Sequence, residues 1–406
     1  LWKEGDPVNA GSYFCYLNQA HYVNGVAAGL STTSNKIGFV AAKPIPSVLS
    51  NVNSVLLGAR SVNPSATVQV IFTGQWSIPV PEAEGSNALL DAGRDLIYRM
   101  AKKADVFIES FRPGVAKRLG IAYADIRALN PRILYLSVSG YGQEGPGSGR
   151  PATDMVIQAN SGFMSVNKGM DDIPHKTGVL IADTATGVYA FQAVAAALYA
   201  REKETEGRYL DISLMQGTAA FLAPKIVEYH AEKGAPRLLN APAGSYRTRD
   251  GWVAVTLVKE HHFKRLCHAV EREDLLDDPR FQSFATRSDN SDVIREIVAA
   301  MLQEHPTDAW IRRFEENEVL ASPINDFGDW LRDAQALATG IAPRIDQPGM
   351  GAIPMPTIPG TSPNTAARTP VSPGVGEHGR DILRDLGLDD AKIDALARDG
   401  AVALPD

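Results

Sequence analysis

The sequence predicts an α/β protein with a parallel sheet, followed by a more helical region and an extended C-terminal part. Strand–helix–strand patterns in the first half carry this prediction, because such units build parallel sheets. A length of 406 residues indicates two or three packed units, since domains cluster near ~150 residues. Apolar residues make up 44% of the chain and charged residues 21%, which excludes disorder as the main state.

The first strand–helix–strand pattern lies between residues 36 and 72. Lys36–Ala42 is a short apolar strand, and Thr67–Phe72 alternates as a second strand. Between them, Pro46–Ala59 carries apolar residues at helical spacing, and Pro64 stops this helix. Together these elements predict one βαβ unit.

A second α/β block follows and ends near residue 214. Helical spacing predicts a helix over 82–103, one or two helices over 115–130 and a long Ala-rich helix over 184–203. The predicted strands of this block are 105–109, 132–139 and 209–214.

The composition changes in the second half of the chain. A strand at 252–257 is followed by helical, charged sequence up to Asp333. Residues 341–375 contain eight prolines, which predicts an extended connector rather than packed elements. A short helical tail over 381–398 ends the pattern.

Charge and cysteine content limit the possible function classes. A net charge of −7 gives no broad basic surface for nucleic acid. No apolar run reaches the ~18 residues of a membrane helix, since Gly187 and Gln192 interrupt Thr184–Tyr199. Cys15 and Cys267 are too few for a disulfide framework, which favours a reducing compartment. We therefore expect a cytoplasmic protein without a membrane or nucleic-acid partner.

The segment Gly140–Gly145 matches the glycine pattern of dinucleotide-binding loops and follows a predicted strand. Such a loop needs a helix that opens at its third glycine. Pro146 and Pro151 oppose a helix there. We predict instead a flexible ligand-binding loop at the carboxyl edge of the sheet, with Gly142, Gln143 and Glu144 as substrate-loop residues.

A metal site is not predicted. The candidates His261, His262, Cys267 and His268 share one helical stretch, but no carboxylate or cysteine pair stands at ligand spacing beside them. Packing or solvation explains these side chains better, and both cysteines are expected to be buried thiols.

Asp183 follows the apolar segment 179–182 and stands directly before the long Ala-rich helix. One interpretation is a helix N-cap, for which Asp is among the best residues. The other is a nucleophile, because the positive end of the helix dipole would keep the carboxylate ionised at the sheet edge. The two roles are compatible, and the local pattern leaves both open.

Seven motifs in order resemble the family III CoA-transferases, the group of formyl-CoA and carnitine CoA-transferases. The resemblance runs from about Gly93 to the C-terminus. The matching blocks are Ala104–Gly114, Leu129–Gly142, Gly178–Asp183, Gly207–Leu214, Leu276–Phe281, Ser322–Asn325 and Gly376–His378.

This resemblance implies that Asp183 attacks an acyl-CoA thioester and passes through aspartyl anhydride and aspartyl-CoA intermediates. Coenzyme A would then be the carried substrate, and no metal is needed. Gly244 and Ser245 stand where the family has a mobile glycine loop. The positions that match CoA contacts are Phe111, Arg118, Leu119, Ser139 and Tyr141.

Two departures from the family pattern bear on these contacts and on a related activity. Ser110 and Ser139 replace the Asn and Lys of some members. The related 2-methylacyl-CoA racemases have a His where this chain has Thr153, so transfer is favoured over racemisation.

The first 92 residues resemble a different family, the basic membrane proteins, which are nucleoside-binding lipoproteins. The segments that carry this likeness are Tyr13–Gly29, Ser34–Ala42, Gly58–Pro64 and Thr73–Trp76. The join falls near Asp91–Gly93, so the chain is interpreted as a chimera. The substituted βαβ unit would complete the sheet in shape while the recognition of adenine is lost. A nucleoside-binding or other solute-binding fragment without catalysis is the alternative from another class.

Together these observations predict a Rossmann-like parallel-sheet large domain and a smaller α+β domain, with a C-terminal segment that returns to the large domain. The resemblance also implies an interlocked homodimer. The expected boundaries are 1–92 for the foreign segment, 93–225 for the large domain, 226–335 for the small domain and 336–406 for the connector and tail.

Overall fold

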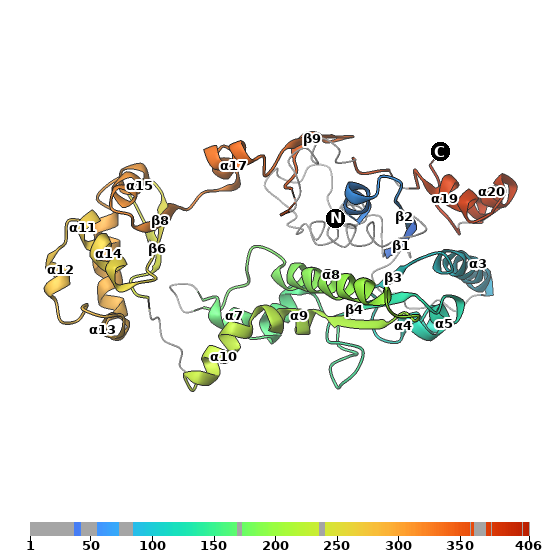
Figure 1. Ribbon diagram of the computed structural model, residues 1–406, viewed down its shortest axis with the longest axis horizontal. Coiled ribbons are helices and arrows are strands. Elements are labelled where there is room, and N and C mark those ends of the chain that lie inside the picture. Colours follow the sequence, from blue (N-terminus) through green and yellow to red (C-terminus); the bar gives the residue numbers. More distant parts are fainter. Residues whose placement is uncertain are drawn as a thin grey trace. The chain divides into compact units, whose positions relative to one another are not determined.

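The computed structural model forms two compact units (Figure 1). Leu1–Ala223 and Ile341–Asp406 make up unit 1, and Pro224–Gly340 make up unit 2. Cys15 and most of the predicted helix over 46–59 lie outside the described residues. The residues that the structure describes are 36–41, 55–72, 84–168, 173–234, 240–357, 359–360, 371–374, 376–399 and 401–405.

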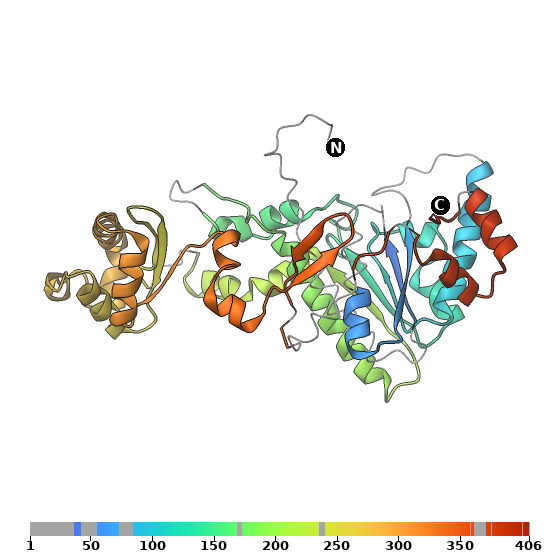
Figure 2. The same ribbon diagram turned by 90° about the horizontal axis from the view of Figure 1, so that it is seen from above.

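Parallel strands form the centre of unit 1 (Figure 2). β1 pairs with β2, and β4 lies between β3 and β5. β1 lies beside β3, so the N-terminal pair continues the layer of the central sheet. The predicted α/β fold with a parallel sheet is confirmed. The strand bounds are Lys36–Ala41 for β1, Thr67–Phe72 for β2, Val106–Glu109 for β3, Leu134–Ser139 for β4 and Tyr209–Ser213 for β5.

Alternating side chains give the sheet β3-β4-β5 two different faces. On one face, apolar residues of the three strands pack against α8, which runs from Ile181 to Arg201. On the other face, Phe107 and Tyr135 stack with ring centroids 5.0 Å apart and join a core with α3, α5 and the C-terminal tail. The helices near this second face are α3 (Glu84–Ala101), α4 (Val115–Arg118), α5 (Tyr123–Leu129), α19 (Gly379–Asp385) and α20 (Asp390–Arg398).

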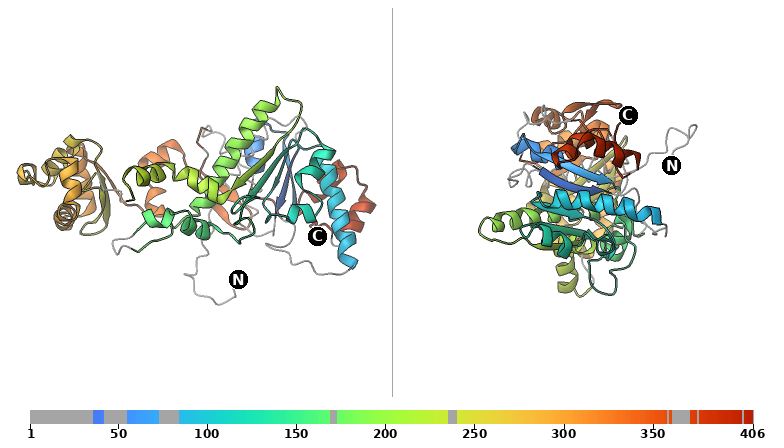
Figure 3. Two further views of the ribbon diagram at one scale, coloured as in Figure 1. Left: turned by 90° about the horizontal axis from the view of Figure 1, so that it is seen from below. Right: turned by 90° about the vertical axis from the view of Figure 1, so that its right-hand side faces the viewer.

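The C-terminal tail returns to the core of unit 1, as predicted (Figure 3). Leu383 and Leu386 from α19, together with Ile393 from α20, are buried against the core that α3 and α5 form. The single helix predicted for this tail is in fact two helices. Gly387 separates them in the left-handed region, with φ of 85°.

Two expectations from composition need correction. Residues 344–354 are not a plain connector, because β9 (Arg344–Gln347) and β10 (Gly351–Pro354) pair as an antiparallel hairpin. Within the described residues, α8 is long and apolar enough to cross a membrane by length and composition. Its buried side chains Val194 and Leu198 pack against the sheet, so α8 is the core helix of unit 1.

Unit 2 has an antiparallel sheet in the order β6-β7-β8, covered by helices around a core that contains Trp310 and Phe314. The strands are β6 (Gly244–Arg247), β7 (Trp252–Thr256) and β8 (Leu320–Pro323). The helices are α11 (Glu260–Ala269), α12 (Asp274–Asp277), α13 (Phe284–Asp289), α14 (Ser291–Leu302), α15 (Thr307–Glu316), α16 (Phe327–Trp330) and α17 (Ala334–Thr339).

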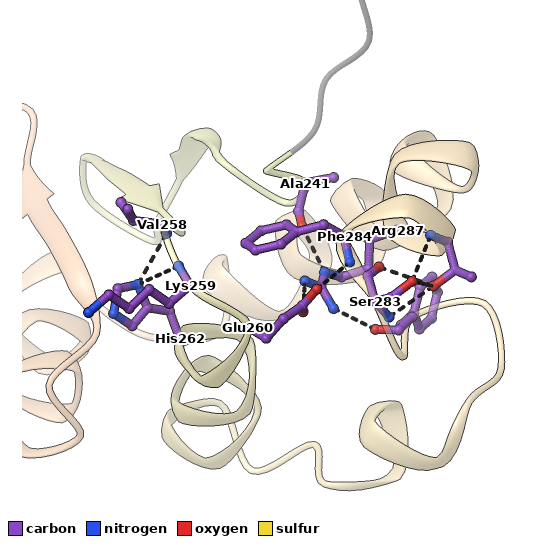
Figure 4. A network of polar contacts seen from close by, with 10 residues as sticks. Ala241, Val258, Lys259, Glu260, His262, Ser283, Phe284 and Arg287 are labelled. Carbon is purple, nitrogen blue, oxygen red and sulfur yellow. Dashed lines mark hydrogen bonds and ion pairs between the residues drawn. The ribbon is translucent and has the colours of Figure 1, made fainter.

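A buried arginine ties the segments of unit 2 together (Figure 4). The Arg287 guanidinium donates to the carbonyl oxygens of Ala241 (3.2 Å) and Phe281 (2.7 Å), and it pairs with Glu260 (2.5 Å). It also lies over the Phe263 ring, 4.4 Å from the ring centroid. Because each side of the guanidinium meets an acceptor or an aromatic face, these contacts compensate the free-energy cost of burying its charge.

Candidate active site

Asp183 lies in the first turn of α8. The helix begins at Ile181, so Leu180 is the N-cap residue and Asp183 is the third residue of the helix. The N-cap interpretation of Asp183 is therefore wrong. Leu180 has no side-chain acceptor for the free N–H groups of the first turn, and these need a partner from elsewhere.

That partner is Asp154, the first residue of α6 (Asp154–Asn160). Its carboxylate is buried, and Oδ2 accepts from the backbone N–H groups of Ala182 (2.8 Å) and Asp183 (3.2 Å). Oδ1 accepts from Nε2 of buried Gln158, and Oε1 of Gln158 accepts from the Thr177 N–H (3.0 Å). A side chain from another helix thus caps α8 and fixes the backbone at Asp183.

The electrostatic setting of Asp183 differs from the prediction. Burial and, to a smaller extent, the neighbouring negative charge of Asp154 raise the pKa of Asp183 to about 7. The expectation that the helix dipole alone keeps this carboxylate ionised is therefore not met. Asp183 changes charge near neutral pH, which is a property typical of functional sites.

The other end of α8 shows where Asp183 lies on the sheet. The Arg201 guanidinium, at the end of α8, donates to the carbonyl oxygens of Asp105 (3.2 Å) and Arg132 (3.1 Å), which precede β3 and β4. The C-terminus of α8 is therefore at the amino edge of the sheet. A helix of 21 residues is about 30 Å long, so Asp183 lies toward the carboxyl edge, where α/β proteins bind ligands.

α9 packs closely against the first two turns of α8. It spans Leu214–Phe221, directly after β5, and Ser213 caps it by accepting from the Gln216 N–H (3.0 Å). A Cβ atom on Gly217 would lie 2.9 Å from Cα of Thr186, so glycine is required at this contact. The beginning of α8 is thus held by α6 and α9 together.

The segment Gly140–Gly145 does not open a helix, which agrees with the interpretation that it is no dinucleotide loop. Gly142 has φ of 94°, a conformation that favours glycine, and its N–H donates to Ser139 Oγ (3.0 Å). Gln143 donates from its backbone to Asp211 Oδ2 (3.1 Å) and from Nε2 to Ser137 Oγ (2.9 Å). The loop predicted to be flexible is therefore fastened to β4 and β5.

The positions expected to contact CoA are spread along the carboxyl ends of β3 and β4. Phe111 and Leu119 are half-buried against the core with α3 and α5, and Arg118 is exposed at the end of α4. Ser139 is buried at the end of β4, whereas Tyr141 is half-buried in the following loop.

The remaining candidates for substrate contact differ in their exposure and in the secondary structure to which they belong. Glu144 is exposed in the loop after β4. Gly244 and Ser245 do not form a loop, because they are the first residues of β6 and pair with Val255 and Ala254. Thr153, at the racemase histidine position, is the N-cap residue of α6.

Cys267 and His262, two of the metal-ligand candidates in α11, take part in packing and in hydrogen bonding. Cys267 is buried as expected, and this burial raises the pKa of its thiol to about 12. Nδ1 of His262 accepts from the N–H groups of Val258 (3.1 Å) and Lys259 (3.4 Å) at the start of the helix. Within the part of the chain that the structure describes, no group of three or more His, Cys, Asp or Glu side chains could hold a metal ion.

Asp154 is the residue of the site that the sequence did not reveal. An acidic residue at a helix start is ordinary in sequence and indicates only a local cap. Here Asp154 caps a helix that begins 27 residues later. The sole sequence signal was its place between a glycine-rich loop and an apolar helix.

Solved structures share the fold. A CAIB/BAIF family protein from Brucella suis matches with a TM-score of 0.67 and 24% identity, over 88% of this chain and 100% of that chain. The hypothetical protein Rv3272 from Mycobacterium tuberculosis matches with a TM-score of 0.67 and 21% identity, over 85% of this chain and 97% of that chain. At these identities the likeness shows the α/β fold alone.

The family follows from sequence. The family model for CoA-transferase family III matches residues 89–379, and the chain belongs to this family. The succinyl-CoA:glutarate CoA-transferase of Mus musculus is 30% identical, over 76% of this chain and 73% of the mouse protein. The acetyl-CoA:oxalate CoA-transferase of Acetobacter aceti is 31% identical, over 75% of this chain and 79% of that protein.

The N-terminal resemblance is also confirmed. A second family model, described as ABC transporter substrate-binding protein PnrA-like, matches residues 3–110. The two matches overlap between residues 89 and 110, a stretch that includes most of α3 and all of β3.

Proposed function

We propose that this protein transfers CoA from an acyl-CoA donor to a carboxylic acid acceptor, with Asp183 as the covalent nucleophile. The observation that carries the proposal is the position of Asp183, held in the first turn of α8 by the buried Asp154 at the carboxyl edge of the sheet. Because the backbone that carries this carboxylate is fixed, less freedom is lost when its oxygen meets a bound thioester.

The proposed reaction proceeds by exchange between activated acyl groups. Ionised Asp183 attacks the thioester carbonyl of the donor, and the CoA thiolate leaves as a mixed anhydride forms. The thiolate then attacks the Asp183 carbonyl carbon, which releases the donor acid and leaves an aspartyl-CoA thioester. The acceptor carboxylate attacks this thioester and forms a second anhydride, whose acceptor carbonyl takes the thiolate back. The new acyl-CoA leaves, and the Asp183 carboxylate is restored.

Two backbone N–H groups near Asp183 are already used in this arrangement. Those of Ala182 and Asp183 donate to Asp154, so they do not stabilise a developing oxyanion. The developing oxyanion therefore requires another donor, because a donor aimed at the oxyanion is the largest single contribution in acyl transfer.

The relatives suggest the class of acceptor. The names of two of them specify succinyl-CoA with glutarate and acetyl-CoA with oxalate. We therefore propose dicarboxylic acids as acceptors. Transfer is preferred to racemisation because Thr153 carries no group that exchanges a proton near neutral pH.

The proposal is tested by trapping the acylated enzyme. Incubation with succinyl-CoA and hydroxylamine should place a hydroxamate on Asp183, located by peptide mass spectrometry. Asp183→Asn should give neither label nor transfer to glutarate or oxalate. Asp292→Asn is the matched control, since Asp292 is also in the first turn of a helix but belongs to unit 2. A hydroxamate on another residue, with Asp183 unmodified, would refute the assignment.

We propose further that the first 92 residues are a foreign segment and that this substitution weakens CoA binding. The match of residues 3–110 to the PnrA-like model supports a foreign origin, and the position of β1 beside β3 explains how the fold tolerates it. Isothermal titration with CoA measures the effect against an intact family member. A dissociation constant equal to that of the intact protein would contradict weakened binding.

We also propose a cytoplasmic homodimer. Support comes from the exposed apolar side chains of α9 and of α10 (Ala223–Ala231), which a single chain leaves open to water. These side chains are Met215, Phe221, Ile226, Val227 and Tyr229. Light scattering coupled to size exclusion should give twice the chain mass of 43.7 kDa, and a mass of one chain would exclude the dimer.

A further inference from the structure

Gln158 is a buried polar residue that the proposed reaction does not use. It lies on α6, one turn after Asp154, and is 1% exposed. A carboxamide has two N–H donors and an oxygen that accepts, and a buried polar group without a partner costs free energy. The partners of Gln158 therefore show which parts of the site this amide holds in place.

Thr177 fixes the orientation of the amide. The Thr177 N–H donates to Oε1 of Gln158 (3.0 Å), and a backbone N–H can only donate. The oxygen of Gln158 must therefore point toward Thr177, which turns its NH2 group toward Asp154. Nε2 donates to Oδ1 of Asp154 and, at 3.4 Å, to the carbonyl oxygen of Val179.

These contacts reach the beginning of α8 from two sides. Through Asp154, the amide supports two N–H groups of the first turn, including that of Asp183. Through Thr177 and Val179, it holds the segment that leads into the helix. The Thr177 hydroxyl also donates to the Val179 carbonyl oxygen (2.6 Å), which closes this segment on itself. Gln158 thus joins α6 to both sides of the point where α8 begins.

Two of the helices that pack against α6 carry no ionisable side chain, namely α7 (Phe163–Val166) and α9. α8 brings Asp183 in its first turn, and the segment before α8 carries Lys176, which is exposed. Gln158 itself has no proton to lose. It therefore holds Asp154 in the same way over the whole pH range in which Asp183 changes charge.

We propose that Gln158 is a positioning residue that locks Asp154 to the segment 177–179 and thereby holds the first turn of α8 in place for the attack by Asp183. This inference rests on the proposed function, since it concerns the geometry of the same nucleophile. Without the amide, Asp154 loses a donor and the Thr177 N–H loses its acceptor, so the beginning of α8 is held less firmly. A displacement of a reacting group by about 1 Å can slow a reaction about 100-fold.

The first variant removes both functions of the amide. Gln158→Met keeps the length of the side chain but offers neither the donor for Asp154 nor the acceptor for Thr177. We expect kcat for transfer from succinyl-CoA to glutarate to fall between about 10-fold and 100-fold. KM for succinyl-CoA should stay within about threefold of the wild type, because Gln158 acts on the nucleophile rather than on CoA binding.

Gln158→Glu gives a sharper test, because a carboxylic acid has nearly the same shape as the amide. While protonated, the new group donates its O–H to Asp154 and offers its carbonyl oxygen to the Thr177 N–H, so kcat should approach that of the wild type. Burial beside Asp154 should raise the pKa of the new group to about 8 or 9. Above this pH the two carboxylates repel each other and their contact is lost. We therefore expect kcat of this variant, but not of the wild type, to fall again at high pH.

Asn160→Asp is the matched control, since it makes the same change from amide to acid at an exposed side chain of α6. Its profile of kcat against pH should equal that of the wild type. Circular dichroism at each pH gives the folded fraction, by which every rate is divided. Gln158→Glu decides the question even where Gln158→Met does not fold. The inference would be overturned by a wild-type kcat in Gln158→Met, by a Gln158→Glu profile without a basic limb, or by the same limb in Asn160→Asp.

The hydroxylamine label separates this inference from the proposed function. If Asp183 is labelled and Gln158→Glu has no basic limb, the role of Gln158 fails while the nucleophile stands. A label on another residue refutes the nucleophile, and the inference falls with it.

Discussion

The two ends of α8 carry opposite electrostatic arrangements. At the N-terminus, burial raises the pKa of Asp183, and the negative charge of Asp154 adds to this effect. At the C-terminus, the cation of Arg201 pairs with Asp105 at 2.8 Å, and both side chains are largely buried. The C-terminal arrangement also suits the negative end of the helix dipole. At one end a buried charge is compensated, and at the other two like charges are close, which is an arrangement typical of functional sites.

The largest expected effect is that of Asp183→Asn on activity. Loss of the nucleophile should lower kcat about 10⁶-fold, the scale of removing a covalent nucleophile. A steady-state assay of succinyl-CoA consumption with glutarate measures this directly. Activity within tenfold of the wild type would remove Asp183 from the mechanism.

The same variant should be more stable than the wild type at neutral pH. Because the folded-state pKa of Asp183 lies above the ~4 of an unfolded chain, the wild type loses stability as the pH rises from about 4 to about 7. Asn does not titrate, so the gain should reach about 4 kcal/mol at pH 8 and vanish near pH 4. Urea unfolding at both pH values checks this. An equal gain in stability at both pH values would show that the gain does not come from removing the charge of Asp183.

Arg201→Met tests the opposite end of the helix and should destabilise unit 1 by about 3–5 kcal/mol, because it leaves the buried Asp105 unpaired. Asp105 Oδ2 already lacks a hydrogen-bond partner within the described structure. The double variant with Asp105→Leu should recover much of this loss. Thermal and urea unfolding measure the change, and a cost below 1 kcal/mol would show that the ion pair contributes little. Activity per folded molecule should stay near that of the wild type.

Asp154→Asn should have the smallest effect and should act on the pH profile. The wild-type kcat should rise with pH through about 7, as Asp183 becomes ionised. An amide at position 154 keeps an acceptor for the two N–H groups but removes the like charge. The acid limb should therefore move down by about one pH unit. If the acid limb of the kcat profile does not move, burial alone explains the raised pKa of Asp183.

Much of the fold was readable from periodicity, since β1, β2 and α8 all lie where apolar spacing placed them. The number of prolines in 341–375 did not indicate the hairpin of β9 and β10, because a turn depends on where a proline stands. Pro348 and Gly349 form a turn, in which Gly349 has φ of 77°. The Met350 N–H donates to the carbonyl oxygen of Gln347 (3.0 Å) across this turn.

The site was readable only in part. Motifs indicated Asp183, but its raised pKa comes from burial and, to a smaller extent, from Asp154 on another helix. Spacing along the chain shows neither. Gln143 was expected to contact substrate. That expectation stays a prediction, and the structure adds that the amide nitrogen of Gln143 donates to Ser137 Oγ in β4.

The return of the tail to unit 1 has a consequence for synthesis of the chain. Ile393 is fully buried in the core around α3 and α5, although it lies some three hundred residues after them. A nascent chain therefore cannot complete this core until Ile393 has left the ribosome. A premature stop codon before Ile393 would leave the nucleophile encoded and its supporting unit open to proteolysis.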